Sequence, residues 1–351
     1  MPLSSTLSNW RTLTRTVDKI KPDASFIRNL VFPGQGQTFS TPEVRFDVIE
    51  GGREVSPFVR RGGEAVRIRG YGHKRRVIET PNIKLKMEID PEAYAQSAAP
   101  GTIQELLSGD SSMEASVRAQ VARDLTRLKR MGGNTVEWMC CRALDGTLSY
   151  AGSEGTDSWE IVYSTRSGYD TTWVKTASII EKTRAVKHAM NKEGFNPTVV
   201  VMGEAAAARV IGHDEWKTTY NQALASRLAA NEVSVSLTSP IGANGAVAEG
   251  MFGQLPWYTY TYEVTPWGGS SEALIPTNNI YFIDTSPSSE NEIYYGGIYD
   301  VKTMNKTFAL REFSKSWEQD DPSLAFMLYQ TRPLPVLRKP YSILKVVTSD
   351  T

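Results

Sequence analysis

The stretch DSSMEASVRAQVARDLTRLKRMGGNTVEWMCCRAL, residues 110–144, predicts the one long helix of the chain. Apolar residues recur in it mostly every three or four positions, which draws a single stripe along a helix. The stripe consists of Met113, Val117, Val121, Leu125, Leu128, Val136 and Met139. Much of the remaining surface is charged, through Glu114, Arg118, Arg123, Asp124, Arg127, Lys129 and Arg130. Ser111 and Glu114 form a capping box, in which each side chain satisfies a free amide at the helix start.

Two glycines, Gly132 and Gly133, interrupt the stripe, and each costs roughly 1 kcal/mol of helix stability relative to alanine. They mark either a kink or a boundary between two helices. If the helix is continuous, about 35 residues at about 1.5 Å each span roughly 50 Å. A helix of that length predicts a strut in a flat or elongated subunit, although a long amphipathic helix is more often an ordinary core helix.

The composition is that of a globular protein with room for two or more domains: 351 residues, 40% hydrophobic and 22% charged. The 39 Lys and Arg balance the 39 Asp and Glu, which argues against a dedicated nucleic-acid binder. No apolar run approaches the roughly 20 residues of a membrane span, and residues 1–15 lack the apolar core of a secretory signal. The two cysteines, Cys140 and Cys141, are adjacent, which disfavours a disulfide and indicates a reducing compartment.

Two stretches before the helix need a partner surface. Residues 1–42 are rich in proline and turn-forming residues, and we expect an extended arm that buries its apolar patch FIRNLVF (residues 26–32) on something else. Residues 43–82 contain two alternating runs, 43–49 and 65–71, which predict a long two-stranded β-ribbon. An isolated hairpin is marginal in water, so the ribbon also needs a partner.

The ribbon is basic. Between residues 51 and 82, eight basic residues oppose three acidic ones, a formal excess of about five positive charges. The basic residues are Arg53, Arg60, Arg61, Arg67, Arg69, Lys74, Arg75 and Arg76.

The remaining chain divides into three parts. Residues 83–195 continue with a strand, the long helix, a hairpin and a helix over residues 176–192. One face of that second helix is expected to be buried and consists of Ile179, Ile180, Ala185, His188 and Ala189. We expect His188 to be a hydrogen-bonded core residue rather than a ligand. Residues 196–312 open with a buried strand and a helix, but they lack the glycine spacing of a nucleotide site. Residues 313–351 contain two final strands, which we expect to return to the body of residues 83–195.

The sequence contains no convincing group of catalytic or metal-binding residues. Cys140 and Cys141 fall within the long helix pattern, where cysteines usually serve as buried packing residues. The cluster HDE, residues 213–215, lies in a predicted loop and is more often solvated than metal-binding. Nothing distinguishes the paired acids from other surface acids: Asp90, Glu92, Asp320 and Asp321. We therefore expect no catalytic, cofactor-binding or metal-binding residues, and a protein that is not an enzyme.

Taken in order, the predicted elements are an arm, a basic ribbon, a strand, a long helix, a hairpin, a second domain and a return to the first. In this order the sequence resembles the major capsid proteins of lambda-like tailed bacteriophages, which have the HK97 fold. The segments that carry the resemblance are FIRNLVF (26–32), TPEV (41–44), VSPFV (55–59), RIRGY (67–71), PNIK (81–84), NPTVVV (196–201) and residues 323–347 with QTRPLP (330–335). No single segment is diagnostic, and residues 222–289 match only in general type.

The resemblance implies an α+β fold with an N-terminal arm (1–42), an extended loop (43–82), a peripheral domain with a spine helix (83–195), an axial domain (196–312) and return strands (313–351). It implies a structural subunit of the virion that assembles in the host cytoplasm into hexamers and pentamers of an icosahedral head around double-stranded DNA. No long helical segment precedes the arm, so we expect a separate scaffolding protein, with a portal and a decoration protein as further partners.

The resemblance also suggests which residues contact neighbouring subunits. In the arm these are Phe26, Ile27, Leu30 and Phe32. In the extended loop they are the eight basic residues, which we expect to pair with acidic faces of neighbours rather than with DNA. Each exposed ion pair contributes only about 0–1 kcal/mol to the contact between subunits, so the contact would depend on how many pairs form and on their alignment.

Two other functions stay open. An encapsulin-like compartment that encloses a cargo enzyme fits the arm and the ribbon equally well. A soluble two-domain hydrolase would need a pocket with a strained titratable group, and the sequence offers none. Electron microscopy of the purified protein would separate shells from monomers, and co-purifying DNA with a portal would separate a phage head from a compartment.

Overall fold

The computed structural model describes residues 10–20, 25–34, 36–50, 72–89, 112–151, 158–162, 171–174, 178–218, 246–266, 269–286, 291–300, 309–319 and 324–349. The helices are α1 (Trp10–Lys19), α2 (Phe26–Val31), α5 (Ser112–Leu144), α6 (Ile179–Lys192) and α7 (Glu204–Gly212), with a short 3-10 turn at Pro340–Ser342. The strands up to α7 are β1 (Gln37–Thr38), β2 (Glu43–Glu50), β3 (Gly72–Glu79), β4 (Ile83–Ile89), β5 (Thr147–Ala151), β6 (Ser158–Val162), β7 (Thr171–Val174) and β8 (Val199–Met202). The later strands are β9 (Ala246–Phe252), β10 (Leu255–Tyr260), β11 (Glu263–Val264), β12 (Glu272–Ala273), β13 (Asn279–Ile283), β14 (Glu292–Tyr295), β15 (Glu312–Gln319), β16 (Leu324–Thr331), β17 (Pro333–Val336) and β18 (Ile343–Ser349).

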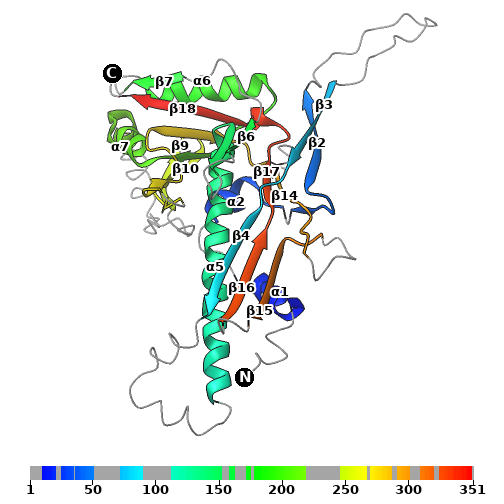
Figure 1. The fold of residues 1–351 in the computed structure, drawn as a ribbon. Coiled ribbons are helices and arrows are strands. Elements are labelled where there is room, and N and C mark those ends of the chain that lie inside the picture. The colour runs from blue at the N-terminus through cyan, green and yellow to red at the C-terminus, as the bar shows by residue number, and fades with distance from the viewer. Residues whose placement is uncertain are drawn as a thin grey trace, which may run out of the picture.

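The predicted long helix is α5, and it runs unbroken through both glycines for 33 residues, or roughly 50 Å at about 1.5 Å per residue. Packing explains the glycine at position 132. A Cβ there would lie 2.5 Å from Cε1 of Tyr329 on β16, so only glycine lets the tyrosine ring approach the helix backbone. Figure 1 shows α5 as the axis along which the other elements are arranged.

The lower body of the molecule is a three-stranded antiparallel sheet, in the order β15-β16-β4, laid along α5 (Figure 1). Leu125 and Leu128 of α5 pack against Met327 and Tyr329 of β16 in a buried apolar cluster, which Leu85 and Met87 of β4 flank. Leu13 and Val17 of α1 belong to the same cluster, so the helix α1 completes the core of this body.

The upper body is a six-stranded sheet in the order β7-β18-β13-β8-β10-β9. Strand β8 is buried on both faces, as its run VVVM predicts. Val200 and Met202 share an apolar cluster with α6 and α7, whereas Val199 and Val201 share one with the upper end of α5. The sheet is therefore a layer between two small helices and the end of the spine (Figure 1).

Strand β18 lies between β13 and β7, with Ile283 opposite Ile343 and Thr171 opposite Val346. Of the predicted return strands, β16 pairs with β4 and β18 pairs with β7, both within residues 83–195, but β18 also pairs with β13 and so belongs to the six-stranded sheet.

The predicted β-ribbon is present as β2 paired with β3, from Glu43 opposite Glu79 to Glu50 opposite Gly72. The second strand of the ribbon thus includes residues 72–79, whereas the predicted run 65–71 lies outside the described residues. In Figure 1 the two strands project away from both bodies.

Two sequence-based expectations differ from the structure. The arm is helical in residues 10–19 and 26–31, where we expected extended chain. On α6 the buried face is formed by Ile179, Thr183, Val186, Ala189 and Met190, so His188 is exposed and not a core residue. The sequence pattern places Ile180 on the buried face, but this side chain is 45% exposed, so the observed buried face is rotated relative to the predicted one.

Candidate functional site

The junction between the arm and the spine is built around one carboxylate. Glu137 of α5 is fully buried, and its Oε1 accepts a hydrogen bond from the backbone amide of Ile27 at 2.7 Å. Its Oε2 accepts from the amide of Arg28 at 3.0 Å. These are two of the first amides of α2, which have no partner within their own helix. Glu137 therefore caps the arm helix from the neighbouring spine.

The same carboxylate reaches the upper body. The hydroxyl of Tyr260 on β10 donates to Oε1 of Glu137 at 3.3 Å. The ring of Phe26 lies 5.5 Å from the ring of Tyr258 and 5.4 Å from that of Tyr260. Burial raises the pKa of Glu137, and the hydrogen bonds from the amides of Arg28 and Ile27 and from Tyr260 counteract part of this shift. One side chain thus connects the arm, the spine and the six-stranded sheet.

The other arm helix, α1, is held by a lysine. Lys129 of α5 is 5% exposed, and its Nζ donates to the carbonyl of Val17 near the end of α1. The same Nζ forms an ion pair with Oε2 of Glu312 on β15 at 2.9 Å. Thr14 adds a hydrogen bond to the carbonyl of Ser314. The sequence pattern places Lys129 on the charged surface of the helix, whereas in the structure α1 and β15 cover it.

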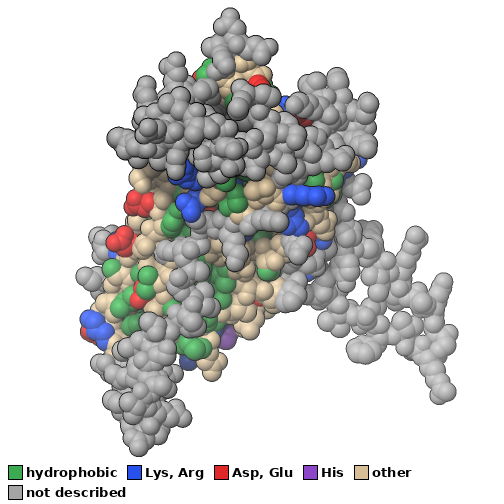
Figure 2. All heavy atoms as spheres, turned by 90° about the horizontal axis from the view of Figure 1, so that it is seen from below, with side chains coloured by type: hydrophobic (Ala, Val, Ile, Leu, Met, Phe, Trp, Pro, Cys, Tyr) green, Lys and Arg blue, Asp and Glu red, His purple; other side chains and the backbone are tan. Residues whose placement is uncertain are grey.

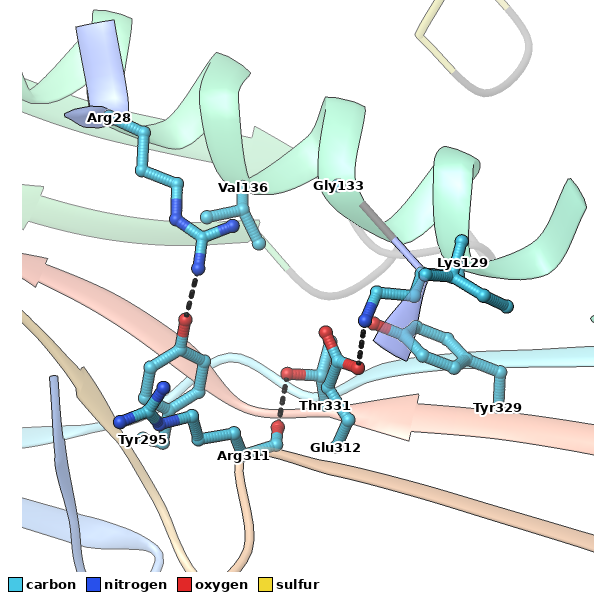
Figure 3. Close-up of a pocket in the computed structure, with 10 residues that line it drawn as sticks. Arg28, Lys129, Gly133, Val136, Tyr295, Arg311, Glu312, Tyr329 and Thr331 are labelled. Carbon is cyan, nitrogen blue, oxygen red and sulfur yellow. Dashed lines mark hydrogen bonds and ion pairs between the residues drawn. The ribbon is translucent and has the colours of Figure 1, made fainter. Parts of the chain in front are cut away.

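A cavity of about 220 Å³ lies between these two anchors. Figure 3 shows that the spine, the arm and the strands β15 and β16 all contribute to its wall. Arg28 donates to the hydroxyl of Tyr295 at 3.2 Å, and Thr331 donates to the carbonyl of Arg311 at 2.7 Å. The charged groups at its wall are engaged in contacts that hold elements together, and no nucleophile lies beside a base among the described lining residues.

The root of the ribbon is fixed to the body by hydrogen bonds. The carbonyl of Pro42 accepts from the amide of Thr80 at 2.9 Å and from its hydroxyl at 2.8 Å. Arg332 donates to the carbonyl of Thr80 at 3.2 Å and pairs with Glu79 at 3.4 Å. Gly296 packs so closely here that a Cβ would lie 2.1 Å from Oγ1 of Thr80. The direction in which the ribbon leaves the body is therefore defined.

The predicted site residues fall into three groups. Five of the ribbon residues lie outside the described residues: Arg53, Arg60, Arg61, Arg67 and Arg69. Three lie on β3, opposite β2: Lys74, Arg75 and Arg76. The arm residues Phe26, Ile27 and Phe32 are buried by their own chain, and Leu30 packs against the same cluster half-buried. This differs from the predicted contact with a neighbour, because the spine and the upper sheet already cover the patch.

The part of the chain that the structure describes offers little for catalysis or metal binding. Cys140 and Cys141 are buried, as predicted, and burial raises the pKa of both thiols, which makes them poor nucleophiles. No cluster of His, Cys, Asp or Glu in the described ranges has the arrangement of a metal site. None of the helices in those ranges has the length and apolar character of a membrane span. In Figure 2 acidic, basic and hydrophobic side chains are interspersed.

The sequence reasoning missed Lys129 and Glu137 as anchors. A signal existed for Lys129, because it directly follows Leu128 of the apolar stripe and lies towards the packed side of the helix. The sequence indicates the burial of Glu137 less clearly, because the one hint is its position as a single acid between the apolar residues Val136 and Met139.

The family model described as phage major capsid protein E matches residues 9–348. A solved structure assigned as the capsid protein of a prophage of E. coli CFT073 is 18% identical, with 96% of each chain covered and a TM-score of 0.64. A phage-related protein from Bordetella bronchiseptica RB50 is 9% identical, with 98% of each chain covered and a TM-score of 0.52. No curated protein matches the chain.

These two structures share the fold of this chain over almost its whole length, and the predicted α+β fold of the HK97 type is confirmed. The family match covers both bodies, the spine and the ribbon. The chain therefore belongs to the phage major capsid protein E family, and it is a structural subunit of a phage capsid.

Proposed function

We propose that this subunit assembles into hexamers and pentamers of an icosahedral head that encloses double-stranded DNA. The observation that carries this proposal is the β2–β3 ribbon. It is a two-stranded sheet that leaves the body, and among the described residues each strand pairs only with the other. A two-stranded ribbon is marginal in water. A neighbouring subunit that covers the ribbon would supply the burial it lacks.

Each part of the subunit then takes a role in the shell. The ribbon, residues 43–82, is the extended loop that lies across a neighbour. The lower body on α5 is the peripheral domain. The six-stranded sheet of the upper body is the axial domain, which meets its copies around five-fold and six-fold axes. Because β7, α6 and β18 belong to this sheet or pack on it, we extend the axial domain beyond residues 196–312 to include residues 171–192 and 343–349.

The arm has a different role from the predicted one. Its apolar patch anchors it to its own spine through Ile27 and the carboxylate of Glu137. Contact with a neighbour would then fall to the exposed residues of the arm, such as Asn29. We propose that the basic residues of the extended loop, including Arg67 and Arg69, pair with acidic faces of adjacent subunits.

Other proteins complete the proposed assembly. We propose a separate scaffolding protein, a portal and a decoration protein as partners, with assembly in the host cytoplasm and the mature subunit in the virion. The DNA inside would be bound without sequence preference, through its phosphates.

The experiment is charge reversal in the ribbon. Arg67→Glu with Arg69→Glu should leave a soluble, folded subunit that fails to form shells when viewed by electron microscopy. The matched control is Arg184→Glu with Lys192→Glu, which reverses two exposed charges on α6. Normal shells from the ribbon variant would remove the ribbon from the proposal, and monomers from the unmodified protein together with its scaffolding protein would overturn the proposal as a whole.

A further inference from the structure

The exposed side of the spine helix carries a row of arginines. Arg123, Arg127 and Arg130 are all exposed, and we call them the arginine stripe. Their spacing of four and three residues places them within roughly 60° of one another on a helix with 3.6 residues per turn. Along the helix axis the stripe covers about 10 Å, at about 1.5 Å per residue.

The stripe lies opposite the packed face of α5. Val121, Leu125 and Leu128 are buried against β16 and α1. From Arg123 to Leu125 the helix turns by roughly 200°, so the arginines extend away from the sheet when the leucines face it. Among the described residues, the lower body thus presents two different faces: the arginine stripe on the helix side, and the outer face of the sheet.

The intrinsic stability of the helix does not explain the stripe. Arg123 and Arg127 are four residues apart, and like charges at that spacing destabilise a helix. Among the described residues, neither of these two arginines has an ion-pair partner. Asp124, which is half-buried beside them, is the single acid between residues 121 and 136. Within residues 121–136, the exposed side of the helix therefore carries more positive than negative charge.

The outer face of the sheet is balanced in comparison. Lys84 and Lys86 of β4 are exposed, but Glu88 follows them on the same face. The ammonium of Lys86 lies 3.5 Å from the centroid of the Phe326 ring, and Lys315 pairs with Asp300. Among the described residues of this side, Lys86 thus contacts an aromatic ring and Lys315 an acid, and Lys84 is the lysine without such a contact.

We propose that the arginine stripe faces the interior of the shell and contacts the phosphates of the packaged double-stranded DNA. This inference rests on the proposed function, in which the shell encloses DNA. Guanidinium groups bind phosphate oxygens through two parallel hydrogen bonds, and duplex DNA presents one charge per about 1.7 Å of its axis. A row of guanidinium groups can engage such a backbone in many registers, so the contact needs no base sequence. The balanced sheet face would then be the outer side.

The test measures the salt dependence of DNA binding. A fluorescent random-sequence 30-base-pair duplex is titrated with Arg123→Gln/Arg127→Gln, with Lys84→Gln/Lys86→Gln as the matched control, between about 50 and 200 mM salt. Each phosphate contact contributes about 0.9 to the slope of log affinity against log salt, so the arginine variant should lose about 1.8. The lysine control and the charge-retaining Arg123→Lys/Arg127→Lys should keep the wild-type slope.

Circular dichroism and electron microscopy accompany the titration. If the double variant does not fold, Arg127→Gln alone should lower the slope by about 0.9. An unchanged slope, an equal loss in the lysine control, or a folded arginine variant that cannot close shells would each overturn the inference. Failure of the wild-type protein to form shells would instead count against the proposed function, because the duplex titration does not depend on it.

Discussion

The two arm helices dock on the same spine by opposite means. The end of α1 presents the carbonyl of Val17 to the ammonium of Lys129, whereas the start of α2 presents the amides of Ile27 and Arg28 to the carboxylate of Glu137. Both choices follow the helix dipole, which favours a cation at the C-terminus and an anion at the N-terminus. One continuous helix thus fixes the polarity of both arm segments.

The two anchors differ in how their charge is balanced. Lys129 has a counter-ion, Glu312, at 2.9 Å. Glu137 receives its hydrogen bonds from two amides and a hydroxyl, and the charge of Arg28 contributes least to its environment. Burial therefore raises the pKa of Glu137. The comparison indicates that docking of α2 depends on pH through Glu137, a group without a direct counter-ion among the described residues.

The largest loss of stability is expected from a substitution in the apolar cluster on which α1 packs. Leu125→Asp places an unpaired charge in the cluster that holds α1 and β16, at a cost above about 4 kcal/mol, so the subunit should not fold. Circular dichroism after expression tests this. Ala122→Asp, an exposed change on the same helix, should shift the free energy of unfolding by no more than about 0.5 kcal/mol. A soluble, fully helical Leu125→Asp protein would contradict the packing described.

The next effect concerns the anchor of α2. Glu137→Gln turns an acceptor into a donor that faces the amide of Arg28 or Ile27, so one buried donor loses its partner, at about 2–3 kcal/mol. Hydrogen exchange of the α2 amides should accelerate while that of α1 does not. Glu193→Gln, at an exposed position, is the control. Equal acceleration in both arm helices would show that they do not dock independently.

A somewhat smaller effect is expected at the anchor of α1. Lys129→Met removes the ion pair with Glu312 and the bond to the carbonyl of Val17, and we expect a loss of about 2 kcal/mol because Glu312 retains access to water. Denaturant unfolding measures the loss, and limited proteolysis at Arg15 should detect the release of α1. Arg127→Met, two residues earlier on the helix, is exposed and should change neither readout.

The smallest effect is the pH dependence of the α2 anchor. The pKa of Glu137 is raised in the folded state, so the native protein binds a proton on this carboxyl more tightly than the unfolded chain does. The protonated carboxyl therefore stabilises the fold, and this stabilisation is fully present below the ordinary glutamate pKa. That contribution is lost as pH rises through the raised pKa. The stability of the wild type relative to Glu137→Gln should therefore decrease as pH increases from about 4. If the stability of the wild type relative to Glu137→Gln instead increased with pH, the hydrogen bonds from the amides would lower the pKa of Glu137 by more than burial raises it.

The sequence predicted the spine because 33 residues repeat one period many times. It did not predict α1, since Thr12, Thr14 and Thr16 are weak helix formers and docking on β15 decides the conformation. The helix α2 has six residues, too few for a periodic signal. The anchors were missed for a related reason: periodicity shows which side of a helix is covered, but not which backbone groups another segment brings there.

Long-range pairing was also beyond the sequence. The sequence of residues 313–351 predicted two final strands, and β18 is one of them. It did not indicate that the strand would lie beside β13, because nothing local to a strand specifies a partner some 60 residues earlier. The family resemblance compensated for part of this and led to the confirmed capsid function, whereas the basic residues of the ribbon remain a prediction.

Strand β18 has a consequence for the order of events during translation. The ribosome releases β7 and β13 long before it has synthesised residues 343–349, yet β18 must enter between them. Until then the upper sheet has a gap, with unpaired edges that a nascent chain must keep from aggregating. A polypeptide that terminates early would lack a finished six-stranded sheet, so truncated products would not reach the native fold that assembly requires.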